Sequence, residues 1–97
     1  MGELRFTWDP TKARENERKH GVTFDEAKTV FSDEGALLID DPDHSDNEDR
    51  FVIIGFSSHA RVVTVCHCYR ESDEVIRLIS ARKATRNESG QYNREKV

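Results

Sequence analysis

Three closely spaced runs of β-branched and aromatic residues in the second half of the chain limit its possible folds most strongly. We predict strands over residues 50–56, 61–69 and 75–82, joined by connections of four and five residues. Connections this short favour an antiparallel meander. Each run carries apolar residues at both odd and even positions, so both faces of the sheet need cover from other elements.

The N-terminal segment should form a strand and then a helix. Residues 4–8 alternate between apolar and polar side chains, which is typical of a short strand. Asp9-Pro10 follows, which combines a good N-cap residue with the residue preferred at the first helical position. Gly21 suits a left-handed C-cap, so the helix should end near His20. From Thr11 to His20 the helix has one apolar residue, Ala13. The face of the helix that packs against the sheet should therefore also carry polar side chains, namely His20 and either Asn16 or Glu17.

A second helix should follow directly. Thr23 and Glu26 have the spacing of a capping box, which predicts a helix start at residue 24. The apolar side chains at helical spacing should pack on the sheet, and they are Phe24, Ala27, Val30 and Phe31. A strand is predicted over residues 35–39, and an acidic, turn-rich loop over residues 40–49.

Together these elements indicate an α+β fold with an antiparallel sheet: a strand, two helices, a four-strand meander and a C-terminal helix. The last helix is predicted from Thr85 and Glu88, which form a second capping box. We expect residues 1–97 to form a single domain. The two N-terminal helices can cover one face of the sheet, whereas the short last helix should cover the other only in part. We therefore expect an exposed apolar patch that binds a partner protein or a second copy of the chain. The alternative is that the last helix and the loops are enough to cover this face.

The charges are distributed unevenly along the chain. Its net charge is −4, yet residues 33–50 hold eight acidic and one basic residue, while residues 77–97 hold six basic and two acidic residues. The basic C-terminal part is the expected site for an anion. Its cationic candidates are Arg77, Arg82, Lys83 and Arg86.

Two of these arginines lie in one predicted strand. Arg77 lies within an apolar run, where a guanidinium either pairs with a carboxylate or faces a groove. Arg77 and Arg82 differ in parity, so they reach one site only if a bulge or a strand end intervenes. Tyr92 in the last helix either packs against the sheet or offers its ring to a nucleic-acid base.

The four histidines are expected to have different roles. His20 is predicted at a helix C-terminus, which favours its imidazolium form, so it either acts as a general acid or bonds the last carbonyls. His67 is expected to be a satisfied core histidine. His44 and His59 lie in predicted loops with nothing to orient them, and no general base is evident.

The cysteines do not indicate a cofactor. Cys66 and Cys68 are two residues apart in a predicted strand, so their side chains point the same way and we expect reduced thiols. The Cys-His-Cys order lacks zinc-site spacing, and we predict neither a metal nor any other cofactor. No apolar run approaches the roughly 18–20 residues that span a bilayer, and the N-terminus lacks a signal-peptide pattern. We therefore expect a cytoplasmic protein without a membrane partner.

Several motifs resemble the BrnT family of bacterial toxins. They are the Trp8-Asp9-Pro10 turn, Lys19-His20-Gly21-Val22, and Ile79-Ser80-Ala81-Arg82-Lys83-Ala84, together with Asn16, Asp33, Glu88 and Tyr92. The resemblance spans nearly the whole chain. It implies a ribonuclease toxin of a type II toxin-antitoxin pair with a RelE-like fold, which cleaves RNA and so inhibits translation.

The resemblance also implies partners and site residues. Its antitoxin would be a BrnA-like ribbon-helix-helix protein, and operator DNA would be bound only through it. RNA cleavage by internal attack needs a proton acceptor, positive charge at the phosphate and an acid for the leaving oxygen. The catalytic roles then fall on Lys19, His20, Arg77 and Arg82, with RNA binding by Lys83, Arg86 and Tyr92, without a metal. One alternative is a non-catalytic module that binds an antitoxin and acts as its co-repressor. Another is a protein that binds DNA directly, which the negative net charge disfavours.

Overall fold

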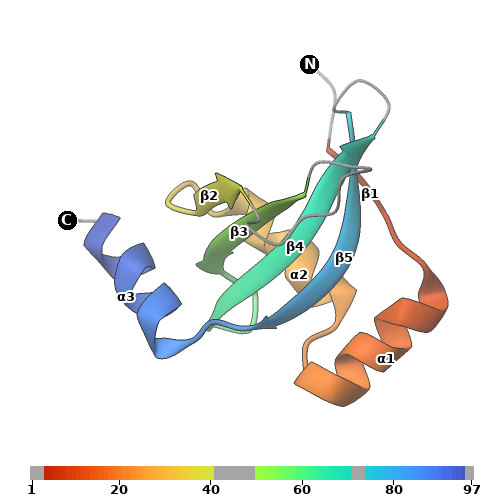
Figure 1. Cartoon of the computed structure of the whole chain (residues 1–97), viewed down its shortest axis with the longest axis horizontal. Coiled ribbons are helices and arrows are strands. Elements are labelled where there is room, and N and C mark those ends of the chain that lie inside the picture. The colour runs from red at the N-terminus through yellow and green to blue at the C-terminus, as the bar shows by residue number, and fades with distance from the viewer. Residues whose placement is uncertain (1–3, 41–49, 71–73, 96–97) are drawn as a thin grey trace.

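The computed structural model describes residues 4–40, 50–70 and 74–95, so the predicted acidic loop lies outside the described residues from position 41 on. The elements follow the predicted order of a strand, two helices, four strands and a final helix (Figure 1). They are β1 (Arg5–Thr7), α1 (Pro10–His20), α2 (Phe24–Thr29), the 3₁₀ turn η1 (Val30–Ser32), β2 (Leu37–Asp40), β3 (Phe51–Phe56), β4 (Val62–Arg70), β5 (Val75–Lys83) and α3 (Arg86–Glu95). The fold is therefore α+β with a five-stranded sheet.

The sheet is mixed, and the prediction of an antiparallel sheet is wrong at one edge. The strand order is β1-β5-β4-β3-β2, and the meander from β2 to β5 is antiparallel throughout. At the far edge β1 runs parallel to β5, with Arg5 opposite Val75 and Thr7 opposite Arg77. Two strands joined by a short turn must be antiparallel. β1 and β5 are instead separated in sequence by all the other strands and two helices, so the sequence did not determine their relative direction.

Local capping determines where α1 begins and ends. The Asp9 side chain accepts a hydrogen bond from the backbone N–H of Thr11, 2.8 Å away, and Pro10 occupies the first turn. At the other end Gly21 has φ 70°, and its N–H donates to the carbonyl of Glu17. Only glycine adopts this left-handed conformation without strain, which is why the helix ends at His20 as predicted.

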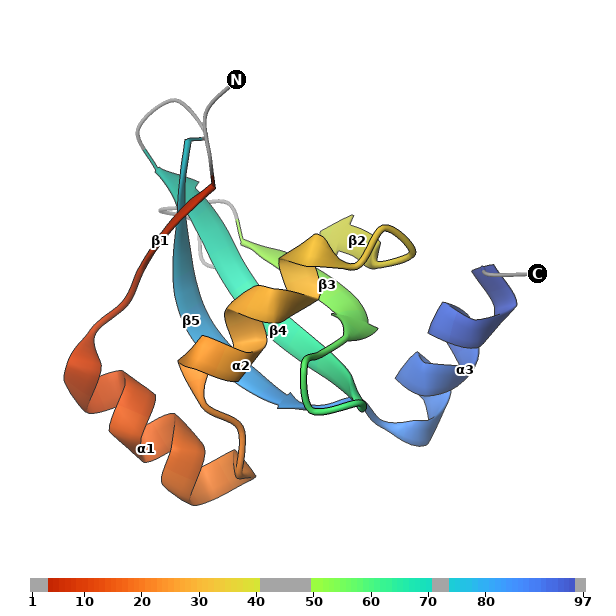
Figure 2. The same cartoon turned by 180° about the vertical axis from the view of Figure 1, so that it is seen from behind.

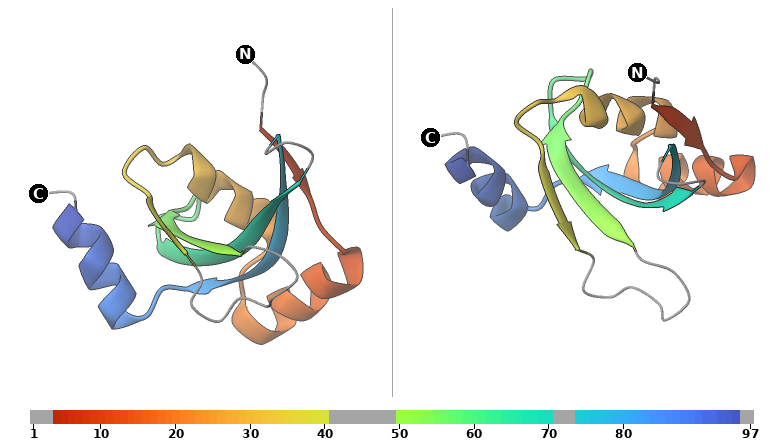
Figure 3. Two further views of the ribbon diagram at one scale, coloured as in Figure 1. Left: turned by 45° about the horizontal axis from the view of Figure 1, so that its top comes forward. Right: turned by 90° about the horizontal axis from the view of Figure 1, so that it is seen from above.

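Helices α1 and α2 cover one face of the sheet (Figures 2 and 3). The hydrophobic core lies between them and the strands, and it is formed by Val22, Phe24, Ala27, Val30, Ile53, Val63, Val65, Ile76, Leu78 and Ala81. The predicted inward residues of the second helix are confirmed, with Phe31 partly buried against the core. No helix in the described ranges is long and apolar enough to cross a membrane.

The opposite face is covered less completely. Within the described ranges α3 is the helix that contacts it, and it packs near β3 at one end (Figure 3). Ile54 is fully buried on this face, whereas Phe56 is 48% and Ile39 is 39% exposed. The register places all three on the same side, because Ile54 pairs with Leu37 and Thr64 while Ile39 pairs with Val52. An apolar patch thus remains in contact with solvent.

His67 is buried but only partly satisfied. Its Nδ1 lies 3.3 Å from the Val65 carbonyl oxygen, while its Nε2 has no hydrogen-bond partner among the described residues. Aromatic rings surround it, with centroid distances of 4.8 Å to Phe31, 6.2 Å to Phe51 and 5.3 Å to Tyr69. The expectation of a core histidine is confirmed, but one nitrogen remains unpaired there, and burial lowers the pKa of His67.

This burial should make the protein less stable in mild acid. The unfolded chain protonates His67 below a pKa of about 6.5, but the folded chain resists protonation, so stability is full above that pH and falls below it. At pH 5.5 the loss attributable to His67 should be up to about 1.4 kcal/mol. Urea unfolding at pH 7.5 and 5.5 measures it, with His67→Phe as the control that lacks the titrating group. An equal pH dependence in both proteins would contradict the prediction.

Candidate functional site

A bulge in β5 brings Arg77 and Arg82 onto the same face of the sheet. Leu78 pairs with His67, and Ser80 pairs with Cys66, so Ile79 is an extra residue in β5. The bulge shifts the alternation by one residue, and Arg77 then faces the same side as Arg82, which is the side opposite α1 and α2. Their pairing partners are four residues apart in β4, which separates their Cα atoms by about 13 Å along the strand.

Arg82 is held by Glu88 at the start of α3. Its guanidinium donates two hydrogen bonds, of 2.7 Å and 3.0 Å, to the two oxygens of the Glu88 carboxylate. Glu88 also accepts from the Thr64 hydroxyl and from the Thr85 N–H, so the predicted capping box is confirmed. The Arg82 guanidinium lowers the pKa of Glu88 to about 2, which keeps the pair ionised. Arg82 therefore anchors α3 to the sheet, and its charge is balanced.

Four of the other predicted cations lie at one end of the molecule. Arg61 donates to the Gly21 carbonyl at 2.9 Å, and the Ala84 N–H donates to the Val62 carbonyl at 3.0 Å. These bonds join the end of α1, the start of β4 and the end of β5 (Figure 2). We call this region the cationic edge, after the exposed side chains of Lys19, His20, Lys83 and Arg86. Among the described residues, none of these four side chains forms a hydrogen bond or an ion pair.

Arg77 lies away from the cationic edge, near the start of β5. Its side chain is half-buried, and its strand neighbours are Thr7 in β1 and Cys68 in β4. Within the described ranges it has no carboxylate partner, which leaves its charge available on the less covered face. The structural ion pair that was the alternative reading of Arg77 is therefore not found in this part of the chain.

The proposed stacking role of Tyr92 does not fit the structure. Tyr92 is only 3% exposed, so no face of its ring is open to a base. Its hydroxyl donates a 2.6 Å hydrogen bond to Asp33, whose carboxylate also accepts from the N–H groups of Gly35 and Phe56. Tyr92 thus packs α3 against the end of β3, and this structural role was the alternative.

A cluster around Glu26 was missed in the sequence. The Glu26 side chain is 1% exposed, and its two oxygens accept hydrogen bonds from Arg61, at 2.8 Å and 2.6 Å. The Ser57 hydroxyl donates to it at 2.6 Å, and Nδ1 of His59 lies 3.2 Å from Oε1. The Arg61 guanidinium is the main cause of the lowered pKa of Glu26. His59, expected to have nothing to orient it, is therefore held beside a buried carboxylate.

The capping-box interpretation of Glu26 concealed this cluster. Thr23 does cap α2, because its hydroxyl accepts from the Glu26 N–H at 3.0 Å. The Glu26 side chain, however, binds Arg61, which is 35 residues away in sequence. An acidic residue at the third helical position has an immediate local explanation, so nothing in the sequence points to a distant partner for Glu26.

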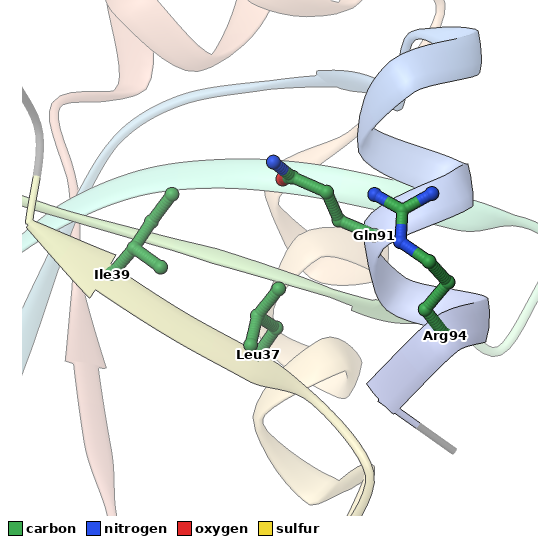
Figure 4. A pocket seen from close by; sticks show the side chains of 4 residues that line it. All are labelled: Leu37, Ile39, Gln91 and Arg94. Atoms are coloured by element: carbon green, nitrogen blue, oxygen red, sulfur yellow. The ribbon is translucent and has the colours of Figure 1, made fainter. Parts of the chain in front are cut away.

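A small pocket lies between β2 and α3. Leu37 and Ile39 line it from β2, and Gln91 and Arg94 line it from α3 (Figure 4). Its volume is about 330 Å³. Two aliphatic side chains on one wall and two polar ones on the other make it amphipathic.

Comparison with known proteins identifies the family. A family model described as "Ribonuclease toxin, BrnT, of type II toxin-antitoxin system" matches residues 8–88. The chain belongs to the BrnT family. A type II system pairs a toxin with an antitoxin, so membership in the BrnT family implies an antitoxin partner. The matched range contains the end of α1, the Glu26 cluster and the junction of β5 with α3.

A solved structure supports the BrnT fold. The 1.1 Å crystal structure of the Brucella abortus ribonuclease toxin BrnT is similar to this chain, with a TM-score of 0.62 and 23% sequence identity. The alignment covers 87% of this chain and all of the Brucella chain. A comparison with curated proteins found no match. At this identity the likeness concerns the fold alone.

Proposed function

We propose that this BrnT protein is a metal-independent endoribonuclease that inhibits translation by cleaving RNA. The supporting observation is the cationic edge: four exposed side chains without partners among the described residues, in a chain whose net charge is −4. Positive charges on neighbouring side chains repel one another, and binding of a polyanion relieves that repulsion. We also propose that the five-stranded sheet with its flanking helices is of the RelE-like type.

The proposed substrate runs from the cationic edge onto the less covered face. Lys83 and Arg86 bind backbone phosphates at the edge, and Arg77 binds a further phosphate on the less covered face, near the start of β5. Lys19 and His20 lie at the C-terminus of α1, where the helix dipole favours a positive charge. Lys19 stabilises the charge of the reacting phosphate, and His20 acts as the acid for the leaving oxygen. Arg82, balanced by Glu88, supports the site by holding α3.

The proposed antitoxin is a BrnA-like ribbon-helix-helix protein that neutralises the toxin by covering this surface. The exposed apolar side chains of Phe56 and Ile39 on the less covered face suit such a partner. Operator DNA would be bound only through the antitoxin, because the chain itself is acidic.

The RNA contacts can be tested by charge removal and salt dependence. Purified protein should cleave a fluorogenic RNA oligonucleotide at low salt in the presence of EDTA. The double variant Lys83→Gln/Arg86→Gln should bind single-stranded RNA more weakly, and the slope of log affinity against log salt concentration should fall by about 1.4, at about 0.7 per phosphate contact. Fluorescence anisotropy at several salt concentrations measures this slope.

Lys12→Gln is the matched control, because Lys12 is exposed at the other end of α1. This variant should keep both the affinity and the slope of the parent protein. An unchanged slope in the double variant would exclude the cationic edge as the RNA site. Intact RNA after incubation with the parent protein would instead favour a non-catalytic module that only binds the antitoxin.

A further inference from the structure

The proposed ribonuclease still lacks a general base, and the turn between β3 and β4 holds a candidate. The His59 side chain is 59% exposed, and its Nδ1 lies 3.2 Å from Oε1 of Glu26, which is itself 1% exposed. A buried carboxylate beside one ring nitrogen favours the tautomer with the proton on that nitrogen. The other nitrogen, Nε2, then has a free lone pair. A carboxylate and a histidine in this arrangement form a proton acceptor oriented by its partner.

The turn that carries His59 is fixed in place. The Ser57 N–H donates to the Arg61 carbonyl at 2.9 Å, and the Ala60 N–H donates to the Ser57 carbonyl at 3.0 Å. The His59 N–H donates to the Ser57 hydroxyl oxygen at 3.2 Å. Ala60 has φ 60°, a left-handed conformation that a residue with a side chain adopts at some cost in free energy. Several hydrogen bonds within the turn thus hold the backbone of His59 in place, although its ring is exposed.

Arg61 contacts both the Glu26 carboxylate, beside which His59 lies, and the backbone at the end of α1. One nitrogen of Arg61, Nη2, is 2.6 Å from the same Glu26 oxygen that His59 approaches. The same nitrogen is 2.9 Å from the carbonyl oxygen of Gly21, the residue that follows His20. A continuous chain of contacts therefore connects the turn that carries His59 to the end of α1. The turn of His59 and the end of α1, which carries His20 and Lys19, can then supply the three functions that RNA cleavage needs: a base, an acid and positive charge.

We propose that His59 is the general base of the cleavage reaction and that Glu26 is its positioning residue, an inference that rests on the proposed ribonuclease function. Nε2 of His59 accepts the proton of the 2′-hydroxyl as O2′ attacks the adjacent phosphorus. The bond from phosphorus to O5′ breaks, and the His20 imidazolium gives its proton to O5′. The products are a 2′,3′-cyclic phosphate and a 5′-hydroxyl, and exchange of protons with water restores both histidines.

Glu26 itself does not serve as the base. Both of its oxygens already accept hydrogen bonds from Arg61 or Ser57, and almost none of the side chain is exposed. A substrate hydroxyl cannot reach it without displacing Arg61. The ring of His59 is the most exposed side chain of this cluster, so it is the one that a substrate reaches most readily.

Two substrates distinguish the base from the acid. A natural RNA dinucleotide needs both groups, whereas a nucleoside 3′-(4-nitrophenyl phosphate) releases nitrophenolate without an acid. His59→Gln should lower kcat/KM by about 100-fold or more on both substrates, because a general base contributes at least that much. His20→Gln should lower it only on the dinucleotide. The limb of the pH profile that rises with pH should also disappear in His59→Gln.

Ser58→Ala is the matched control in the same turn, because the Ser58 side chain is exposed and only its backbone N–H bonds Thr29. It should keep parental activity, and thermal unfolding should show that all variants remain folded. If the parent cleaves RNA and His59→Gln cleaves equally fast, or is impaired on the dinucleotide alone, the assignment of the base is wrong while the ribonuclease function stands. If the parent cleaves neither substrate, the proposed function itself fails.

Discussion

Replacing Asn16 with leucine should lower the free energy of unfolding by about 4 kcal/mol, because three buried polar groups lose their partners at roughly 1–3 kcal/mol each. The Asn16 amide nitrogen donates to the carbonyls of Val22 and Ala81, at 2.9 Å and 2.8 Å. Its amide oxygen accepts from the Ala81 N–H at 3.0 Å. β1 pairs with β5 only as far as Arg77, so beyond it the edge of β5 is completed by this side chain. Urea unfolding at neutral pH measures the change.

Two further variants sharpen the Asn16 test. Asn16→Asp keeps the acceptor for the Ala81 N–H but turns a carboxylate towards two carbonyl oxygens, so it should be destabilised as well. Glu15→Ala changes an exposed residue of the same helix and should alter the free energy by no more than about 0.5 kcal/mol. A loss below about 1 kcal/mol in Asn16→Leu would show that water replaces the missing bonds.

Replacing Arg61 with methionine should destabilise the protein by about 3 kcal/mol at neutral pH, because removing one partner of a buried ion pair leaves the other charge uncompensated. Among the described residues, Glu26 would then keep Ser57 and His59 as polar neighbours. The Arg61→Met/Glu26→Leu double variant should recover much of the loss, since it buries no charge. Chemical unfolding of the two single variants and the double variant gives the coupling energy of the pair.

The pH dependence of the Arg61 variant provides a second measurement. In the parent protein Arg61 lowers the pKa of Glu26, so the pair stabilises the fold above a pH of about 4.5, the ordinary pKa of a glutamate, and this contribution is lost in acid. Without Arg61, burial raises the pKa of Glu26, and protonation removes the buried charge. The difference in stability between parent and variant should therefore be largest near neutral pH and shrink on acidification. A difference that is constant from pH 7 to pH 4 would contradict this account.

The helices and strands were predictable because their signals are local. Asp9, Pro10 and Gly21 determine the ends of α1 through caps that involve only neighbouring residues. The three apolar runs gave β3, β4 and β5 to within one residue at either end, and the short connections gave their antiparallel order. The direction of β1 was not predictable, because no short turn links β1 to its partner strand.

The candidate site was only partly predictable. Lys19, His20, Lys83 and Arg86 were recognised as candidates from charge and position, and the structure brings them to one edge. Tyr92 and Arg82 instead hold α3, since each is bonded to a carboxylate, Asp33 or Glu88, that the sequence did not assign to it.

By itself the sequence determined the elements, their caps and the concentration of positive charge near the C-terminus, because these depend on residues close together in the chain. The tertiary structure alone decided which side chains meet. The extra residue Ile79 turns Arg77 to the side of Arg82, and a contact over 35 residues makes Glu26 the partner of Arg61. Such pairings depend on strand register and on which segments pack together, and a single sequence carries no local signal for either.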